Sequence, residues 1–513
     1  MAEGGDRAAG WRTLWVTAAV CAVVLVVVRV LSPSDLTEGH QWRTNAYTID
    51  MLANGRWFLP VDTTGLGATK PPLYNWLSAP LVAVFGPSEA TFKFPALLCA
   101  LATLAATALA AWRVTLRCQG LLDTDPHTPR IAAVTAAFAL LANISTMKLA
   151  WFARPDMPLQ LWLTLAWLAA VEVTEPGQKR PRLWAWTLWL STGLAGLTKT
   201  PAMLLVYPFV AIIASGPGLR ATARDVGWAW GPALSLGMVI AWLVPAYLTD
   251  PEHFVQTLIV GEAVGHIVDG GRGNLALSLL LDSYKIPFYF VRQFLPWSLV
   301  ALVALWSLWR ERRQWPAVPR GVRAAVWWLL VVAVAFLLVA RKRDDRVAIF
   351  YPQAAVFVGW WIAAGRWREW RTPRRLAAAM AAITLALTLY YFTGTDAVRH
   401  RRGDNGVAFA RAVETAVGDD PVAYIGSPEP HVLLLMGRHR REFPDAASLA
   451  AYPWVVAPTV PALAAFDPVL VSGYLDKQHP WAPAVSELAL YRNSPALQRV
   501  LERALGWPEP SGQ

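Results

Sequence analysis

The stretch Trp15-Val-Thr-Ala-Ala-Val-Cys-Ala-Val-Val-Leu-Val-Val-Val-Arg-Val-Leu31 decides the fold class of this chain. It is apolar at nearly every position, and an apolar run of roughly 20 residues crosses the hydrocarbon of a bilayer as a helix. Arg7 and Arg12 precede the run, and no convincing small-residue cleavage site follows it. We therefore expect a retained signal anchor.

Apolar blocks of similar length recur as far as residue 392. Of the 513 residues, 55% are hydrophobic and 16% are charged, whereas in soluble chains about a quarter of the residues are charged. A soluble globular class is excluded, and we expect an α-helical polytopic membrane protein with about eleven spanning helices. Leu183–Ser215 fits either a tight hairpin or one bent pair. Besides Trp15–Leu31, the candidate spans are Phe94–Trp112, Ile131–Met147, Met157–Val173, Leu183–Leu197, Pro201–Ser215, Trp228–Tyr247, Phe288–Trp309, Ala324–Ala340, Val347–Ala364 and Leu376–Phe392.

The distribution of tryptophan and of charge agrees with this topology. Many of the 28 Trp residues, such as Trp112 and Trp297, flank apolar blocks, where indole rings settle at membrane interfaces. The formal net charge is +11, but most Lys and Arg lie in loops, as in Arg310–Arg313 and residues 366–371, so we expect no nucleic-acid partner. The positive-inside rule then places the N-terminus in the cytoplasm, and an odd number of spans places the C-terminal residues beyond the inner (plasma) membrane, in the periplasm or its equivalent.

The composition changes after residue 394, so we divide the chain into a membrane domain, 1–394, and a soluble periplasmic domain, 395–513. Alternating helix and strand patterns predict a small α/β fold for the second domain. The three cysteines, at positions 21, 99 and 118, lie outside it, so no disulfide framework is implied there. The predicted helices are Asn405–Val417, His431–Met436 and Ser494–Leu505, and the predicted strands are Pro421–Gly426, Trp454–Ala457 and Val469–Ser472.

Basic residues stand on the outer side, where the topology disfavours them. Arg341-Lys-Arg-Asp-Asp-Arg346 forms the densest group, and Lys148, Arg154 and Lys199 lie at outer helix ends. Cations kept there suggest an anionic ligand such as a phosphate at the membrane surface. The alternative is an ordinary salt-bridged loop, because the group contains two aspartates of its own.

Two long outer loops, Ser32–Lys93 and Thr249–Pro287, hold further polar residues. Within the first, Thr44–Gly55 has apolar residues at helical spacing and predicts an interfacial helix. Lys70 precedes Pro71-Pro72, which would hold it at the start of a short helix. In the second loop, residues 270–273 are rich in glycine and predict a flexible loop tip, which could act as a mobile lid over the site.

Acids and histidines gather with these cations on the predicted outer face. A carboxylate there could activate a nucleophile while the cations stabilise a departing phosphate. The alternative for each acid is a helix cap or a salt bridge. The chain contains no Walker loop, dinucleotide fingerprint or His-Glu-x-x-His motif. The residues concerned are Glu38, His40, Asp156, Glu262 and His266.

The order of these features resembles the GT-C superfamily of membrane glycosyltransferases, most closely the branch of the protein O-mannosyltransferases and the lipid A aminoarabinose transferases. Lys70-Pro-Pro-Leu-Tyr-Asn-Trp76 and Leu197-Thr-Lys-Thr-Pro201 carry the resemblance, because they occur in the family's order. The matching segments extend over roughly residues 10–395, by the same order of spans and loops. Further matches are Arg43–Trp57, Arg154–Leu159, Phe294–Trp297 and Lys342 with Tyr351-Pro352.

The resemblance implies inverting transfer of a sugar from a polyprenyl phosphate to a lipid or protein acceptor outside the cytoplasm. It implies an outer-loop acid as base, with Asp156 as the second-loop carboxylate. No cofactor is certain from the sequence, and the acid–histidine combination of Glu38, His40 and Asp156 could bind a divalent metal. The substrate-binding residues that we carry over are Arg43, Lys70, Arg154, Lys199, Arg341, Lys342 and Arg346.

One position departs from the family pattern. An Asp-Glu pair usually precedes the arginine that matches Arg43, and this chain has His40-Gln41 there. Either His40 is the base, or Glu38 or Asp35 supplies the carboxylate from a shifted register, or the chain is inactive or has another acceptor. Two other classes therefore compete with a transferase: a lipid or polyprenol transporter, and a catalytically inert lipid-binding assembly protein. Nearly charge-free spans and the absence of repeats favour the enzyme.

Overall fold

The chain folds into two compact units in the computed structural model. The first comprises Met1–Leu31, Thr69–Tyr74 and Pro95–Tyr390, and the second comprises Ser32–Ala68, Asn75–Phe94 and Tyr391–Gln513. The division at residue 394 stays a prediction, since the second unit also holds segments that precede it. The structure describes residues 2–32, 36, 39–62, 66–117, 127–175, 177–199, 224–256, 258, 282–337, 344–364, 372–394, 406–424, 449–472 and 487–504.

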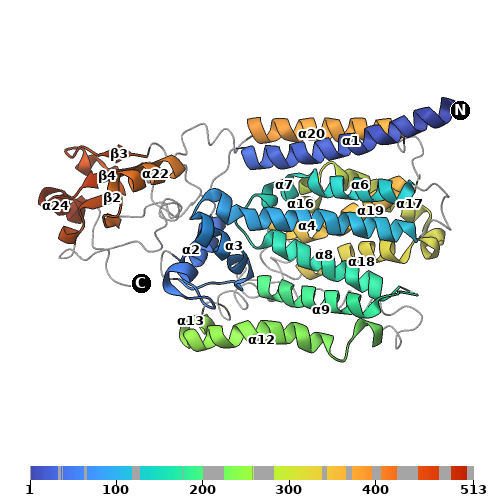
Figure 1. Ribbon diagram of the computed structural model, residues 1–513, viewed down its shortest axis with the longest axis horizontal. Helices are drawn as coiled ribbons and strands as arrows, with labels where there is room; N and C mark the ends of the chain where they lie inside the picture. The colour runs from blue at the N-terminus through green and yellow to red at the C-terminus, as the bar shows by residue number, and fades with distance from the viewer. Residues whose placement is uncertain are drawn as a thin grey trace. The chain divides into compact units, whose positions relative to one another are not determined.

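The first unit is a bundle of helices (Figure 1). Two of its helices, α8 and α19, are buried nearly all round, as expected of apolar helices at the centre of a large bundle. The helices are α1 (Ala2–Leu31), α4 (Glu89–Leu116), α6 (Thr128–Leu141), α7 (Ile144–Ala150), α8 (Asp156–Val173), α9 (Pro181–Thr198), α12 (Gly231–Thr249), α13 (Pro251–Phe254), α16 (Lys285–Gln293), α17 (Trp297–Arg310), α18 (Arg320–Leu337), α19 (Tyr351–Ala363) and α20 (Pro373–Thr393), with 3₁₀ segments η3 (Arg312–Ala317) and η4 (Asp344–Phe350).

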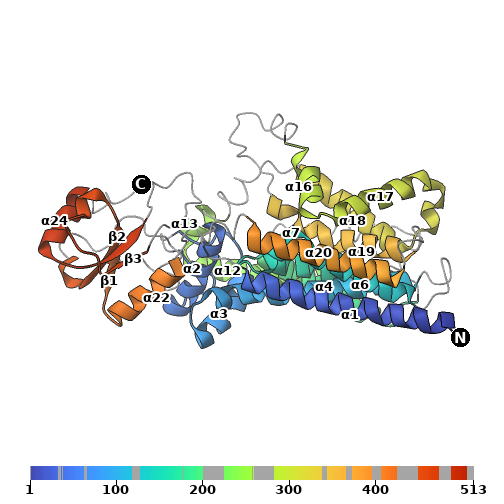
Figure 2. The ribbon, with the colours of Figure 1, turned by 90° about the horizontal axis from the view of Figure 1, so that it is seen from above.

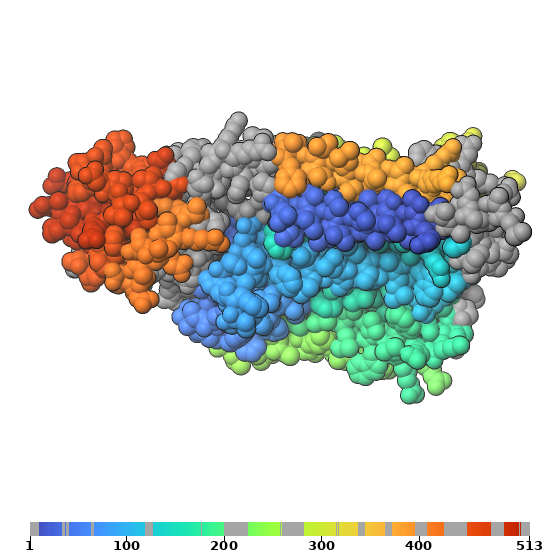
Figure 3. Space-filling model, turned by 45° about the horizontal axis from the view of Figure 1, so that its top comes forward, coloured from blue at the N-terminus to red at the C-terminus, as the bar shows by residue number. Residues whose placement is uncertain are grey.

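Helices α1 and α20 lie side by side at the edge of the bundle in both ribbon views (Figures 1 and 2). In the space-filling view, α1 runs between α20 and α4 on one face (Figure 3). Val16, Val20, Val23 and Val27 of α1 are all exposed. A row of exposed valines on a helix of this length is what a lipid-facing surface requires.

Within the described residues, four helices are long and apolar enough to span a membrane, or up to six if each of two bent pairs is one span. The four are Gly10–Leu31, α4, Arg224–Thr249 and α20. The predicted spans at 157–173, 183–197 and 324–340 form α8, α9 and α18, which are helical but shorter or less apolar. Pro201–Ser215 lies outside the described residues.

Two predicted spans are not single straight helices. Ile131–Met147 is divided between α6 and α7, which meet at 70°. Asn143 causes the break: its side chain accepts from the Thr146 amide at 2.8 Å and donates to the Leu140 carbonyl at 2.6 Å, so it ends one helix and caps the next. Phe288–Trp309 bends by 115° between α16 and α17, next to Pro296, which has no amide to continue the helix.

The centre of the bundle depends on the close approach of α6 and α19. A Cβ at Gly359 would lie 2.5 Å from the Ala132 carbonyl oxygen and 2.9 Å from the Ala136 Cβ. We expect Gly359→Ala to destabilise the protein by about 1–3 kcal/mol through overpacking. Thermal unfolding in detergent measures this effect. Gly237→Ala in α12 is the matched control, because its Cβ would meet nothing within 4 Å and alanine favours a helix; an equal loss in both variants would contradict the packing account.

The second unit contains α2 (Gly39–Asn54), α3 (Leu73–Phe85, from Asn75) and a small α/β fold. The interfacial helix predicted at 44–55 is therefore part of α2. The α/β fold has a sheet of order β1-β2-β4-β3, in which β1 and β2 are parallel and the other pairs are antiparallel. Its elements are α22 (Gly406–Val417), β1 (Val422–Tyr424), η6 (Leu449–Ala451), β2 (Trp454–Pro458), η7 (Pro461–Leu463), β3 (Leu470–Val471), β4 (Leu488–Arg492) and α24 (Pro495–Ala504).

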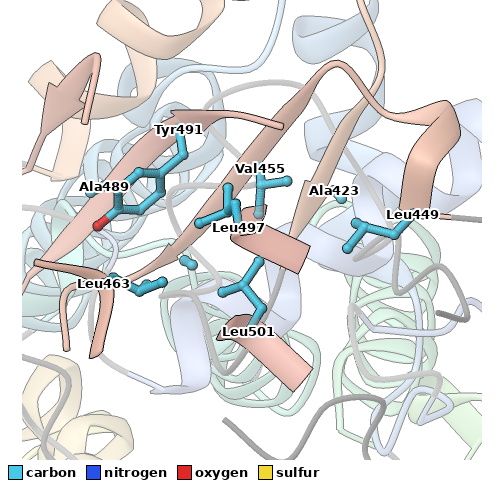
Figure 4. Close-up of a cluster of buried hydrophobic side chains, with 9 residues drawn as sticks. Ala423, Leu449, Val455, Leu463, Ala489, Tyr491, Leu497 and Leu501 are labelled. Carbon is cyan, nitrogen blue, oxygen red and sulfur yellow. The ribbon is translucent and has the colours of Figure 1, made fainter. Parts of the chain in front are cut away.

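The core of this sheet is covered by α24 (Figure 4). Leu497 and Leu501, one turn apart on α24, pack against Val455 and Tyr491, which face each other in β2 and β4. The helix predicted at 405–417 corresponds to α22, and the strands predicted at 421–426, 454–457 and 469–472 correspond to β1, β2 and β3. Strand β4 was not predicted. Its run Leu-Ala-Leu-Tyr is buried throughout and has no alternation to reveal a strand. The predicted helix at 431–436 lies outside the described residues.

Candidate active site

Asp156 is the centre of a buried charge cluster in the first unit. It is the first residue of α8, where the helix dipole favours an acid, and its side chain is 5% exposed. Lys199 Nζ lies 2.8 Å from Asp156 Oδ1, and Arg154 Nε lies 3.0 Å from Asp156 Oδ2. Burial alone would raise the pKa of Asp156, but Arg154, Lys199 and then Lys70 outweigh it and hold the pKa well below its usual range. Asp156 is therefore an ionised carboxylate shared by cations.

Local structure places the two lysines. Lys199 follows the last residue of α9 in an extended conformation, so its side chain leaves the helix end toward α8. Lys70 precedes Tyr74, whose hydroxyl donates to the Phe152 carbonyl at 3.5 Å. Phe152 lies two residues before Arg154, so this bond joins the Lys-Pro-Pro segment to the residues that precede α8. Lys70 is half-buried.

A second carboxylate, Asp345, completes the cluster. Arg154 Nη2 donates to Asp345 Oδ2, so the arginine lies between Asp345 and Asp156. Its side chain is only 4% exposed. Among Lys70, Lys199, Arg154 and the two carboxylates, the cations outnumber the acids by one. A cluster of this composition suits an anion more than a cation.

Asp345 belongs to η4, and side chains of two other helices bind this segment. Gln160 of α8 donates to the Ala348 carbonyl at 2.6 Å. On the other side, Gln293 of α16 donates to Asp344 Oδ2 at 2.8 Å, and Arg292 Nη2 lies 3.6 Å from the same oxygen. The prediction for residues 341–346 included a salt-bridged loop as the alternative, and the described part of this segment does form ion pairs. Arg346 is half-buried in η4.

Arg43 has a partner of its own in the second unit. Its Nε lies 3.3 Å from Asp62 Oδ2, and its guanidinium stacks over Trp42 at 5.3 Å from the ring centroid. Asp62 is buried and also accepts from the Leu66 amide at 3.1 Å. Asp50 accepts from the Val61 amide at 2.7 Å, so both acids tie the segment after α2 back to the helix.

The structure thus brings together four of the predicted site residues: Asp156, Arg154, Lys199 and Lys70. The structure adds Asp345 to this group and, separately in the second unit, shows Asp62 as the partner of Arg43; neither aspartate was selected from the sequence. His40 is the second residue of α2. Within the described part of the chain, no group of three or more His, Cys, Asp or Glu side chains could hold a metal ion. Glu38, Arg341, Lys342, Glu262, His266 and residues 270–273 lie outside the described residues.

No protein-family model matches the chain, and no curated protein matches it in sequence. Solved structures match over nearly its whole length. ArnT from Cupriavidus metallidurans bound to undecaprenyl phosphate is similar with a TM-score of 0.70 at 16% identity, over 94% of this chain and 98% of ArnT. The apo state of ArnT gives 0.67 at 17% identity, over 96% and 99% of the two chains.

A third structure is more distant. The apo oligosaccharyltransferase of Archaeoglobus fulgidus has a TM-score of 0.51 at 12% identity, over 87% of this chain and 69% of that one. Together these likenesses confirm the fold expected from the sequence. The chain has the GT-C fold, that of a polytopic helical membrane protein with a small additional sheet.

Proposed function

We propose that this protein is a membrane glycosyltransferase that takes its sugar from a polyprenyl-phosphate donor. The observation that carries the proposal is the pair of lysines beside Asp156, in a cluster where cations exceed acids. A site that releases a phosphate needs positive charge where the leaving oxygen gathers negative charge. The likeness to ArnT, which was crystallised with undecaprenyl phosphate, supports the same class of ligand.

The family resemblance implies an inverting transfer, and the cluster can stabilise its leaving group. The bond between the anomeric carbon and the phosphate oxygen breaks, and an acceptor hydroxyl or amine forms the new bond from the opposite face, which inverts the configuration. The electron pair of the broken bond leaves on the polyprenyl phosphate, where Lys70 and Lys199 stabilise it. The acceptor proton passes to a base. Arg154 is buried between two carboxylates, so we assign it a supporting role rather than the direct phosphate contact implied by the family resemblance.

Asp156 is a poor choice for the base, because its lowered pKa makes it a weak proton acceptor near neutral pH. We propose His40 or Glu38 as the base, with the acceptor, a lipid or a protein, on the extracytoplasmic side. Arg43, Arg341, Lys342 and Arg346 remain candidates for further donor contacts.

The pH dependence of turnover separates the two bases. If His40 is the base, kcat/KM falls at a pH closer to neutrality, because an imidazole takes up its proton at a higher pH than a carboxylate, whereas for Glu38 the fall comes only in stronger acid. His40→Gln then removes the neutral limb of the profile, and Glu38→Gln leaves it in place. A profile unchanged in both variants would contradict this assignment.

The proposal is tested with purified full-length protein in detergent and a panel of polyprenyl-phosphate sugars. Release of polyprenyl phosphate reports turnover, and thermal stabilisation reports binding. We expect Lys199→Ala to raise the donor KM by about 10- to 100-fold, as for the loss of a charged hydrogen bond.

Lys285→Ala is the matched control. Lys285 is the first residue of α16, its side chain is 28% exposed against 27% for Lys199, and its Nζ also pairs with one carboxylate, Asp282 Oδ1, at 3.0 Å. We expect donor KM and turnover to be unchanged in this variant. If no donor stabilises the wild-type protein or is turned over, the proposal fails, and the transporter and the inert lipid-binding readings take its place.

A further inference from the structure

Four charged side chains form a row of alternating sign in the first unit. Asp345, Arg154, Asp156 and Lys199 follow one another through ion pairs. Exposure of the side chains is 11%, 4%, 5% and 27% along the row, so only the lysine at its end has substantial access to a ligand. The carboxylate at the other end is therefore remote from the ligand but connected to the lysine through two intervening charges.

The segment that carries Asp345 is held from both sides. Gln160, one turn after Asp156 on α8, donates to the Ala348 carbonyl at 2.6 Å. Gln293 of α16 donates to Asp344 at 2.8 Å. A segment bonded to two helices, on one side by a buried hydrogen bond, resists displacement when a ligand arrives, so Asp345 acts as a fixed anchor for Arg154.

We infer that Asp345 is a positioning residue for the donor phosphate: it holds Arg154, so that Asp156 stays turned toward Lys199. The inference rests on the proposed function. Without Asp345, the Nη2 group of Arg154 loses this acceptor and can turn to Asp156, which Nε already meets, and a bidentate pair is the geometry that arginine and carboxylate prefer. Asp156 Oδ1 would then turn from Lys199 toward Arg154, and the lysine would lose its orientation.

Electrostatics alone predicts the opposite change in phosphate affinity when Asp345 is removed, so a binding measurement distinguishes the two explanations. Removing a carboxylate from a cationic site raises the local positive potential and should strengthen the binding of a phosphate. Positioning predicts weaker binding. The sign of the change in affinity therefore separates an anchor from an acid that merely competes with the ligand.

The experiment measures binding of undecaprenyl phosphate to the full-length protein in detergent, with inorganic phosphate as a second probe. For Asp345→Asn we expect about a tenfold loss of affinity for the lipid, the loss of one well-placed charged contact. In a Lys199→Ala background the same change should have little further effect, since both act through one lysine. Asp282→Asn, which removes an ion pair with Lys285 at 3.0 Å, is the control and should leave the affinity unchanged.

Asp345→Glu keeps the charge but moves the carboxylate by one methylene, and it serves if the asparagine variant does not fold. Positioning predicts weaker binding in this variant, whereas a role of charge alone predicts unchanged binding. Equal or tighter binding by Asp345→Asn, or additive losses in the double variant, would overturn the inference while leaving the proposed function intact. Failure of the wild-type protein to bind undecaprenyl phosphate would overturn both the inference and the proposed function. If the loss of affinity in Asp345→Asn is seen with undecaprenyl phosphate and not with inorganic phosphate, it is specific to the lipid.

Discussion

Turnover of the donor is expected to fall by about 100-fold in Asp156→Asn, the largest catalytic effect that the cluster predicts, because a misplacement of about 1 Å in a positioning group can cost about 100-fold in rate. The variant removes the carboxylate that Arg154 and Lys199 share. Arg154 retains Asp345, but Lys199 loses its acceptor at 2.8 Å and the cluster gains a positive charge. The phosphate would still be attracted, yet no longer oriented, so kcat should fall more than donor affinity.

The measurement compares kcat and KM for release of polyprenyl phosphate. Asp250→Asn is a suitable control, because Asp250 also stands at a helix start, capping α13 by accepting from the His253 amide at 3.0 Å, and asparagine caps as well as aspartate. Because the pKa of Asp156 is lowered in the folded protein, its carboxylate stabilises the fold at neutral pH. This stabilisation is lost only as the pH falls into strong acid, through the folded pKa. Normal turnover by Asp156→Asn would remove the cluster from the mechanism.

Much of this cluster was predictable from the sequence, because each member lies in a recognisable local setting. Asp156 and Arg154 lie at the start of an apolar run, and Lys199 lies at the end of another. A helix end is a position that the pattern of apolar residues locates to within a few residues. Three of the partners could therefore be placed at one depth before the structure was known.

Asp345 could not be selected in the same way. Asp345 pairs with Arg154, which lies 191 residues earlier in the sequence, and the local pattern of residues does not predict a contact at that separation. Its neighbour Asp344 is chemically identical but binds Gln293 on a different helix. The sequence indicated that two acids would neutralise cations at this point, but which acid meets which cation depends on the path of η4. Asp62 was not selected because its pairing with Arg43 of α2 depends on the path of the chain after that helix, which the sequence does not show.

The largest effect on stability is expected at the other end of α8. Glu172 lies about 24 Å from Asp156 at 1.5 Å per residue, and its side chain is fully buried. One carboxylate oxygen, Oε2, lies 2.7 Å from Arg113 Nη2 and 2.6 Å from Arg117 Nη2, and it accepts a hydrogen bond from Gln178 Nε2 at 2.8 Å. An acid in the last turn is opposed by the helix dipole, and the two arginines offset this unfavourable interaction.

Glu172→Gln leaves Arg113 of α4 and Arg117, which follows α4, without their shared carboxylate. This should destabilise the protein by about 3–5 kcal/mol and, for a chain of this length, lower Tm by about 3–5 °C. Thermal unfolding in detergent measures the change. Glu175→Gln is the control: burial raises the pKa of Glu175, so the fold favours its charged form less, and its ion pair with Arg117 is longer, at 3.9 Å, so we expect an amide there to cost little. Equal shifts in the two variants would mean that the arginines find other partners. A shift confined to Glu172 would mean that α8 is fixed to α4 at the end opposite Asp156, and that the alignment of the charge cluster depends on a helix held at both ends.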